Sequence, residues 1–204
     1  MQSFPIIPVD EAGRARRSLV HGFGVNDADY QIVPVVDGKR VECPFYKRWA
    51  SMLKRAYSSA FHFKHPTYLG VSVSSEWRLL SNFREWMIEQ DWEGKHLDKD
   101  LLIEGNKLYA PDRCVFVDSM TNNFLKDFSS KGLYMVGAYP HHSGKSFRSV
   151  CRNPFSKRAE HLGMFETDME AHKAWKARKH ELALQLAEQQ TDERVANALR
   201  VRFA

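Results

Sequence analysis

The chain has few cysteines and no long apolar run, and each scarcity excludes a class of protein. Its 204 residues include three cysteines, Cys43, Cys114 and Cys151, which are far apart and odd in number. This spacing offers neither a disulfide framework nor a CxxC metal knuckle. No stretch approaches the roughly 18 apolar residues of a membrane span, and residues 1–20 lack the apolar block of a secretory signal. We therefore expect a cytoplasmic protein with no membrane partner.

Common catalytic motifs are absent as well. The chain contains no Walker loop, no GxSxG and no HExxH, so the usual sequence markers of nucleotide hydrolysis, serine hydrolysis and zinc proteolysis are missing. Aromatic residues, by contrast, are plentiful: 13 Phe, 7 Tyr and 5 Trp in a chain that is 43% hydrophobic. Such a chain can bury a real core, so we expect a globular protein.

Acidic residues are missing from one segment of the chain. Residues 1–130 carry 17 basic and 17 acidic side chains, whereas residues 131–204 carry 13 basic and 8 acidic ones and hold the whole net charge of +5. Within them, residues 131–158 contain six Lys or Arg and no acid. A segment of one sign favours a polyanionic partner, first of all nucleic acid, although a solvated basic loop is the alternative.

The periodicity predicts an α+β protein. Residues 1–40 show no sustained period and are expected to form an arm, with a short strand at residues 31–36 before the Asp37-Gly38 turn. Helical spacing predicts helices over residues 45–57 and 75–90, whose Trp residues should serve the core. Residues 94–117 read as two or three short strands, followed by a helix from about Ser119. We expect residues 41–130 to form one domain.

The remainder of the chain, residues 131–204, should form a second domain. A linker is expected at residues 129–132, followed by strands near residues 135–139, 146–152 and 161–165. Thr167 to Glu170 has the pattern of a capping box, which predicts a long helix to about Gln189 and a last short helix behind it. The prediction is a three-stranded antiparallel sheet packed on a long helix.

The densest polar cluster surrounds Asp98 and Asp100. On a strand their alternation places both carboxylates on one side, about 7 Å apart, with His96 in line. Two such carboxylates can hold one magnesium ion, and a neutral His96 can deprotonate water, as phosphodiester cleavage requires. The alternative is a solvent-facing edge strand with a Gly105-Asn106 turn.

Two resemblances bear on these segments. Residues 40–128 are similar to a family of small phage proteins, the HNH-type or homing endonucleases. That likeness is carried by Cys43-Pro44-Phe45-Tyr46, Trp49, Arg55, Tyr57, Pro66-Thr67-Tyr68, Glu76-Trp77, Ser81-Asn82-Phe83, Trp86, Leu97-Asp98-Lys99-Asp100, Gly105-Asn106-Lys107, Tyr109, Pro111 and Cys114-Val115-Phe116-Val117. Residues 137–177 resemble the ethylene-response-factor type of DNA-binding domain, through Ser146-Phe147-Arg148, His161-Leu162-Gly163, Phe165, Thr167 and Glu170-Ala171.

The first resemblance implies a beta-beta-alpha metal unit in a phage-encoded hydrolase that uses Mg²⁺ or Mn²⁺. It assigns the base and a metal ligand to Asp98 and Asp100, the loop carboxamide to Asn106, and the helix ligand to Asn122 or Asn123. The family places a His on the first strand, where this chain has Asp-Lys-Asp preceded by His96. Family members tend to carry cysteines near Ala56, Val71 and Ser74, so with Cys114 alone we expect no structural zinc and a buried apolar role for that thiol.

The second resemblance implies a sheet in the major groove of double-stranded DNA. Arg148 and Arg152 should share one face and reach guanine edges, while the turn cations reach phosphates. His172 and His180, on the long helix, are expected to be ordinary surface residues. The predicted DNA-binding residues are Tyr139, His141, Lys145, Arg148, Arg152, Lys157, Arg158 and His161.

Three functions follow from these patterns. The first is a DNA endonuclease, a nickase or homing enzyme, with a tethered DNA-binding domain. The second is a non-catalytic DNA-binding or host-interaction protein on a nuclease scaffold that has lost its base. The third, a binder of structured RNA, is disfavoured because the strands lack an RNP-like aromatic pair.

Overall fold

The structure, a computed structural model, describes residues 4–126, 133–142 and 144–204. It divides the chain into two compact units, the first Met1–Glu93 with Leu97–Phe116 and the second Gly94–His96 with Val117–Ala204. The division thus falls near residue 117, earlier than the predicted boundary at 130. The reason is that Phe124, on the helix between these positions, packs against Phe203 in the second unit, with ring centroids 5.6 Å apart. The predicted linker at 129–132 lies outside the described residues.

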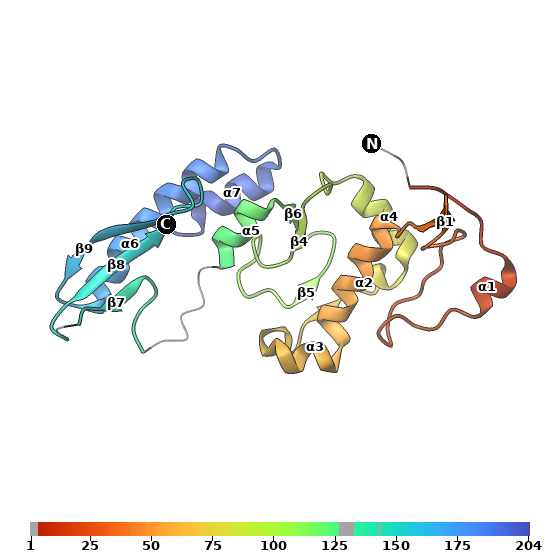
Figure 1. Ribbon diagram of the computed structural model, residues 1–204, viewed down its shortest axis with the longest axis horizontal. Coiled ribbons are helices and arrows are strands. Elements are labelled where there is room, and N and C mark those ends of the chain that lie inside the picture. Colours follow the sequence, from red (N-terminus) through yellow and green to blue (C-terminus); the bar gives the residue numbers. More distant parts are fainter. Residues whose placement is uncertain (1–3, 127–132, 143) are drawn as a thin grey trace. The chain divides into compact units, whose positions relative to one another are not determined.

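The first unit combines helices with short strands (Figure 1). Its elements are α1 (Glu11–Ala15), β1 (Val35–Val36), β2 (Lys39–Arg40), α2 (Pro44–Tyr57), α3 (Ser59–Lys64), η1 (Pro66–Tyr68), β3 (Ser72–Val73), η2 (Glu76–Arg78), α4 (Leu80–Ile88), β4 (His96–Asp98), β5 (Leu108–Tyr109) and β6 (Val115–Val117). The first residue of β4, His96, and the last residue of β6, Val117, belong to the second unit. The predicted helix over residues 45–57 is α2. It buries Trp49, Met52 and Leu53 completely.

The aromatic core of the first unit joins α2 to the segment of η2 and α4. Trp49 Nε1 donates a 2.8 Å hydrogen bond to the Trp77 carbonyl, and the Trp77 ring meets the Phe83 ring edge-on. Both Trp side chains are fully buried. The buried Trp49 indole N–H thus has a partner, and the burial of both rings confirms the structural role expected for Trp49 and Trp77.

The predicted helix over 75–90 is broken at Leu79. Residues 76–78 form the 3-10 turn η2, Leu79 is extended, and α4 starts at Leu80. The break has a tertiary cause, because Leu79 forms a parallel bridge with Val25, whose amide and carbonyl bond Arg78 and Leu80. Sequence periodicity could not anticipate a bridge to a residue 54 positions earlier.

Residues 4–40 are irregular but well anchored. The Arg17 guanidinium donates to the carbonyls of Asn26, Ala28 and Tyr30, at 2.6 to 3.0 Å. The expected strand near 31–36 is limited to Val35–Val36 and pairs with β2 across a turn in which Asp37 and Gly38 have φ of 49° and 73°. The segment is therefore part of the first unit and not a separate arm.

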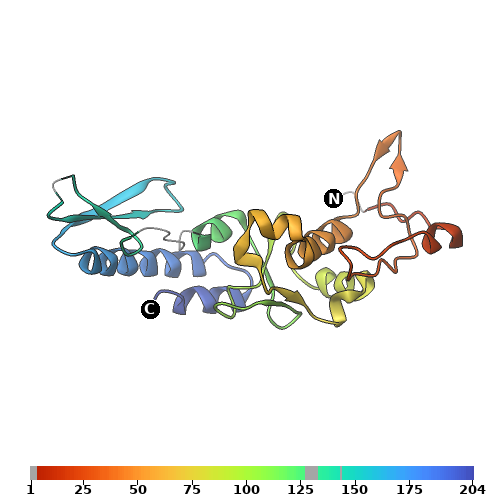
Figure 2. The same ribbon diagram turned by 90° about the horizontal axis from the view of Figure 1, so that it is seen from below.

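The second unit is a three-stranded antiparallel sheet on a long helix, which confirms the predicted α+β class (Figures 1 and 2). Its elements are α5 (Ser119–Lys126), β7 (Ala138–Pro140), β8 (Phe147–Arg152), β9 (Ala159–Phe165), α6 (Asp168–Ala187) and α7 (Glu193–Val201). The strands follow the order β7-β8-β9. In Figure 2 the sheet lies along one side of α6 and α7 along the other.

The start of α6 is set by the predicted capping box. The Thr167 hydroxyl accepts from the Glu170 amide and the Glu170 carboxylate accepts from the Thr167 amide, both at 3.2 Å. The helix then buries Ala171, Trp175 and Leu182.

No helix in the described part of the chain is long and apolar enough to cross a membrane.

The structure confirms the expectation for Cys114 and contradicts the one for the histidines of α6. All three cysteines are buried thiols, and burial raises the pKa of Cys114 to about 12, so its expected role as a small apolar side chain is confirmed. The expectation of ordinary surface histidines on α6 is wrong. His172 and His180 are both half-buried, and His172 Nδ1 lies 2.8 Å from the Val136 carbonyl, because α6 packs against the segment that leads into β7.

Candidate nucleic-acid interface

The sheet of the second unit has one buried and one exposed face. Ala138, Ser149 and Cys151 are buried, and Ser149 Oγ donates a 2.7 Å hydrogen bond to the Ala171 carbonyl on α6. Side chains alternate along a strand, so Arg148, Val150 and Arg152 take the opposite direction. We call this side the outer face. Arg148 and Arg152 are both exposed, in agreement with the prediction that they share a face.

The strand register brings further residues onto the outer face. Tyr139 and Met164 pair with Arg148 from its two sides, and His161 pairs with Val150. The register shifts between Ser149 and Val150, so β9 carries one extra residue and His161 regains the outer side. Four of the eight predicted DNA-binding residues therefore lie on the outer face: Tyr139, Arg148, Arg152 and His161. The sequence interpretation did not include Val150 and Met164 on this face, although the alternation of side chains along the strands places them there with Arg148 and Arg152.

Arg148 is held near Tyr139. Its guanidinium carbon lies 5.6 Å from the centroid of the Tyr139 ring, within the range of a cation–π contact. Both side chains are exposed. Such a contact limits the rotamers that Arg148 samples without covering its N–H groups, so it prepares the guanidinium for a partner in solution.

The strands carry one carboxylate, and it faces away from the outer side. Glu160 pairs with the inward-facing Cys151 and accepts hydrogen bonds from Arg178 on α6 at 2.7 Å and from Asn153 at 2.7 Å. The Arg178 guanidinium, and after it the Asn153 amide, lower the pKa of Glu160 below its ordinary value. The outer face is consequently free of negative charge among the described residues.

The remaining predicted contacts lie in the turns that flank β8. Lys145 belongs to the turn between β7 and β8, with His141 at its start, half-buried and 3.8 Å from the His142 ring by centroids. Lys157 and Arg158 belong to the turn between β8 and β9, where the Asn153 side chain accepts from the amides of Phe155 and Ser156. Lys157 has a φ of 58°, so this turn holds it in the left-handed region.

Most of these cations have no acidic partner. In the part of the chain that the structure describes, carboxylates form no ion pair with Arg148, Arg152, Lys157 or Arg158. By contrast Arg178, Arg194 and Arg200 of the same unit are each paired with an acid. The unpaired guanidinium and ammonium groups lie on the outer face and its turns, where a polyanion would meet them.

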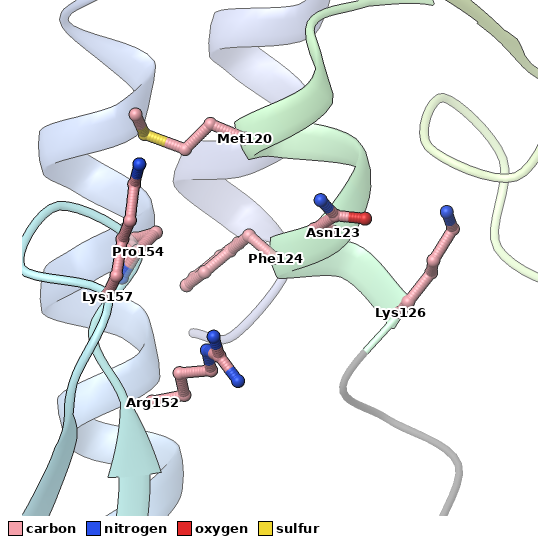
Figure 3. A pocket seen from close by; sticks show the side chains of 7 residues that line it. All are labelled: Met120, Asn123, Phe124, Lys126, Arg152, Pro154 and Lys157. Atoms are coloured by element: carbon pink, nitrogen blue, oxygen red, sulfur yellow. The ribbon is translucent and has the colours of Figure 1, made fainter.

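A hollow of about 480 Å³ lies between α5 and the β8–β9 turn (Figure 3). In Figure 3 Met120 and Phe124 extend from α5 toward the turn, and the Arg152 guanidinium at the end of β8 points toward α5. The lining consists of Met120, Asn123, Phe124, Lys126, Arg152, Pro154 and Lys157. The sequence predicted binding roles for Arg152 and Lys157 but not for Lys126 and Met120. The only sequence feature that pointed to these two residues was their position on the same predicted helix as Asn123.

The candidate metal ligands of the first unit are held in a loop by internal hydrogen bonds. β4 ends at Asp98, and Asp98 Oδ1 accepts the amides of Asp100 and Leu101 at 2.9 and 2.7 Å. Asp100 therefore follows a tight turn and does not continue the strand, which corrects the expected alternation of the two carboxylates. Burial raises the pKa of Asp98, while these two amides act in the opposite direction.

Asn106 closes the same loop. Its Nδ2 donates to the carbonyls of Lys99 and Leu108, both at 2.8 Å, and its Oδ1 accepts the Leu108 amide. The buried Lys99 ammonium bonds the Asp100 carboxylate and the Asn106 carbonyl. Strand β5 pairs with β3 and β4 with β6, so Gly105-Asn106 does not join two paired strands. The hydrogen bonds of Asp98, Asp100 and Asn106 thus order this loop.

The other predicted catalytic residues lie in the second unit. His96 is exposed, and its Nε2 lies 3.1 Å from the Ser119 hydroxyl at the start of α5. Asn122 is half-buried on α5, and Asn123 lines the hollow beside Phe124. Among the described residues, no three His, Cys, Asp or Glu side chains gather in a group that could hold a metal ion.

The chain was compared with protein-family models, with curated proteins and with solved structures, and none of them matches it.

Proposed function

We propose that this protein binds double-stranded DNA through the outer face of the sheet β7-β8-β9. The observation that supports this best is the one-signed charge of that face. Arg148 projects from it, and Arg152 ends the same strand with its guanidinium directed toward α5 (Figure 3). The single carboxylate of the strands, Glu160, is turned to α6 and bonded by Arg178. Three strands span about 10 Å between the outer backbones, which suits a major groove about 12 Å wide.

The expected contacts divide by position. Arg148 and Arg152 lie on the strands, where a guanidinium can form two hydrogen bonds with a guanine edge. Lys145, Lys157 and Arg158 lie in the turns at the two ends of β8, where they can reach phosphates on either side of the groove. The first group would supply sequence preference and the second the general affinity.

DNA is favoured over single-stranded RNA by the scarcity of aromatic rings on this face. In the described strands, Tyr139 is the one Phe, Tyr or Trp that the register places on the outer side. RNA-recognition sheets stack two or three bases on such rings. We also place the protein in the cytoplasm, since its three buried cysteines are thiols.

The affinity for duplex DNA should fall steeply with salt. Contacts from three to five cations to phosphates predict a slope of log K against log salt of about −3 to −5, which is a loss of about 100-fold between 50 and 200 mM salt. Fluorescence anisotropy with a labelled duplex measures this slope. A loss below threefold over the same range would contradict the proposal, and a single-stranded oligonucleotide of the same sequence serves as the control for duplex preference.

A second candidate, DNA endonuclease activity, rests on His96. This exposed imidazole lies on the first strand of the β4–β6 pair that precedes α5, and Ser119 at the start of that helix orients it. The resemblance to HNH-type endonucleases suggests that such a His acts on a water molecule, with Mg²⁺ or Mn²⁺ as the metal. The non-catalytic alternative is supported by the internal bonds of Asp98, Asp100 and Asn106.

Plasmid cleavage separates these two candidates. If the protein nicks supercoiled plasmid with Mg²⁺ or Mn²⁺, His96→Ala should lower the rate about 100-fold, the usual contribution of a general base. His65→Ala removes an exposed histidine of the first unit and should leave the rate unchanged. Intact plasmid together with tight DNA binding would exclude the endonuclease and support the non-catalytic candidate.

A further inference from the structure

The hollow between α5 and the β8–β9 turn combines three cations with an apolar floor. Lys126 ends α5, Arg152 ends β8, and Lys157 lies in the turn behind it. Among the residues that the structure describes, no acid lines the hollow. In the described chain these three side chains have neither an ion pair nor a hydrogen bond to a protein group. Like charges brought together without partners attract an anion.

The floor of the hollow is apolar and firmly packed. Phe124 is 2% exposed, and its ring is held by the Phe203 ring and by the Lys179 ammonium, 3.7 Å from its centroid. Lys179 also donates to the Phe124 carbonyl at 2.8 Å, which anchors α5 on α6. Met120 and Pro154 complete the apolar part of the lining. This floor does not have to form when a ligand arrives, which lowers the cost of binding.

Charge and volume together define the class of ligand. A phosphate alone would be satisfied by cations on an open surface and has no use for an apolar floor. A hollow of about 480 Å³ lies in the size range of small-molecule sites and has room for a ring system as well. The Asn123 amide, also in the lining, offers a donor and an acceptor to a base or a sugar.

We propose that this hollow is a nucleotide site, which holds a terminal phosphate between Lys126, Arg152 and Lys157 and the base or sugar against Met120, Phe124 and Pro154. A terminal phosphate carries about two negative charges at pH 7, whereas an internal phosphodiester carries one, and three cations match the former better. The nucleotide is either free in solution or the 5′-phosphorylated end of a DNA strand. The inference goes beyond DNA binding by the outer face, because a free nucleotide can occupy the hollow in a protein that binds no duplex.

The test uses the whole 204-residue chain and titration calorimetry with dAMP as the probe. We expect dAMP to bind at least tenfold more tightly than deoxyadenosine, which lacks the phosphate, and than inorganic phosphate, which lacks the base and sugar. Lys126→Ala should weaken dAMP binding about tenfold, and Met120→Glu, which puts an acid at a residue that is 37% exposed, should weaken it further. Lys173→Ala, which changes an exposed lysine of α6, should leave it unchanged.

Three results would overturn the inference: no binding of dAMP, equal binding of dAMP and deoxyadenosine, or full dAMP affinity in both Lys126→Ala and Met120→Glu. The source of the nucleotide follows from duplexes with a 5′-phosphate or a 5′-hydroxyl end. A preference for the phosphorylated end that Lys126→Ala removes supports a DNA end, and Lys126-dependent dAMP binding without that preference supports a free nucleotide. Failure of DNA binding by the outer face is recognised separately, as a duplex affinity that does not respond to Arg148→Ala.

Discussion

The double variant Arg148→Ala, Arg152→Ala should bind duplex DNA about 1,000-fold more weakly than the natural chain. Each guanidinium that contacts a base edge contributes about 1–3 kcal/mol, and a total of about 4 kcal/mol corresponds to this loss. The two residues lie on one strand with Val150 between them on the same face. They are exposed and form no ion pair in the described chain, so their removal should leave the fold intact. Anisotropy at constant salt measures the loss.

A matched control separates specific contact from net charge. Lys173→Ala with Lys176→Ala removes the same two charges from the exposed surface of α6, in the same unit. Helix α6 packs against the opposite face of the sheet, so this control should weaken binding less than about fivefold, by long-range electrostatics only. Equal losses in the two double variants would show that the outer face makes no direct contact and would contradict the proposed function.

Gly137→Ala should destabilise the second unit by about 3 kcal/mol. Gly137 precedes β7 with a φ of 80°, and a Cβ there would lie 2.1 Å from Cγ of the buried Trp175. The left-handed backbone costs an alanine roughly 1–2 kcal/mol, and overpacking against a buried ring adds about 1–3 kcal/mol. The Gly137 carbonyl also accepts the Val150 amide, so a shift of this residue disturbs the pairing of β7 with β8.

Gly144 provides the comparison for Gly137→Ala. It has a φ of 70° in the turn between β7 and β8, but nothing lies within 4 Å of the Cβ it would gain. Gly144→Ala should therefore cost only the backbone part, about 1 kcal/mol. Urea denaturation, with amide exchange of α6 and β8 to locate the effect, measures both. If the two variants proved equally stable, the close packing of Gly137 on Trp175 would be wrong.

The helices and strands of the second unit were predictable because their determinants are local. The Thr167–Glu170 box, the apolar spacing of α6 and the turn residues between the strands each act over a few positions. The break at Leu79 and the anchoring of residues 4–40 by Arg17 were not predictable, since both depend on bonds to distant segments.

The candidate sites also differ in whether local sequence patterns could predict them. Tyr139, Arg148 and Arg152 could be placed on one face from strand alternation alone, because a period of two fixes the direction of each side chain. Asp98 and Asp100 follow the same pattern in the sequence, yet the strand ends between them and the Asp98 carboxylate binds two amides of the following turn. Nothing in the local pattern shows where a short strand stops.

The sequence by itself determined the class of the fold, the long helix with its cap, and the segment in which positive charge is concentrated. Composition and spacing act locally, and they suffice for these features. Only the tertiary structure decided that Glu160 turns inward to Arg178, and that Lys126 meets Arg152 and Lys157 around a hollow. The first result depends on α6 packing against the sheet, and the second on α5 packing on α6 and α7 through Phe124. Such contacts follow from the shape of the whole unit.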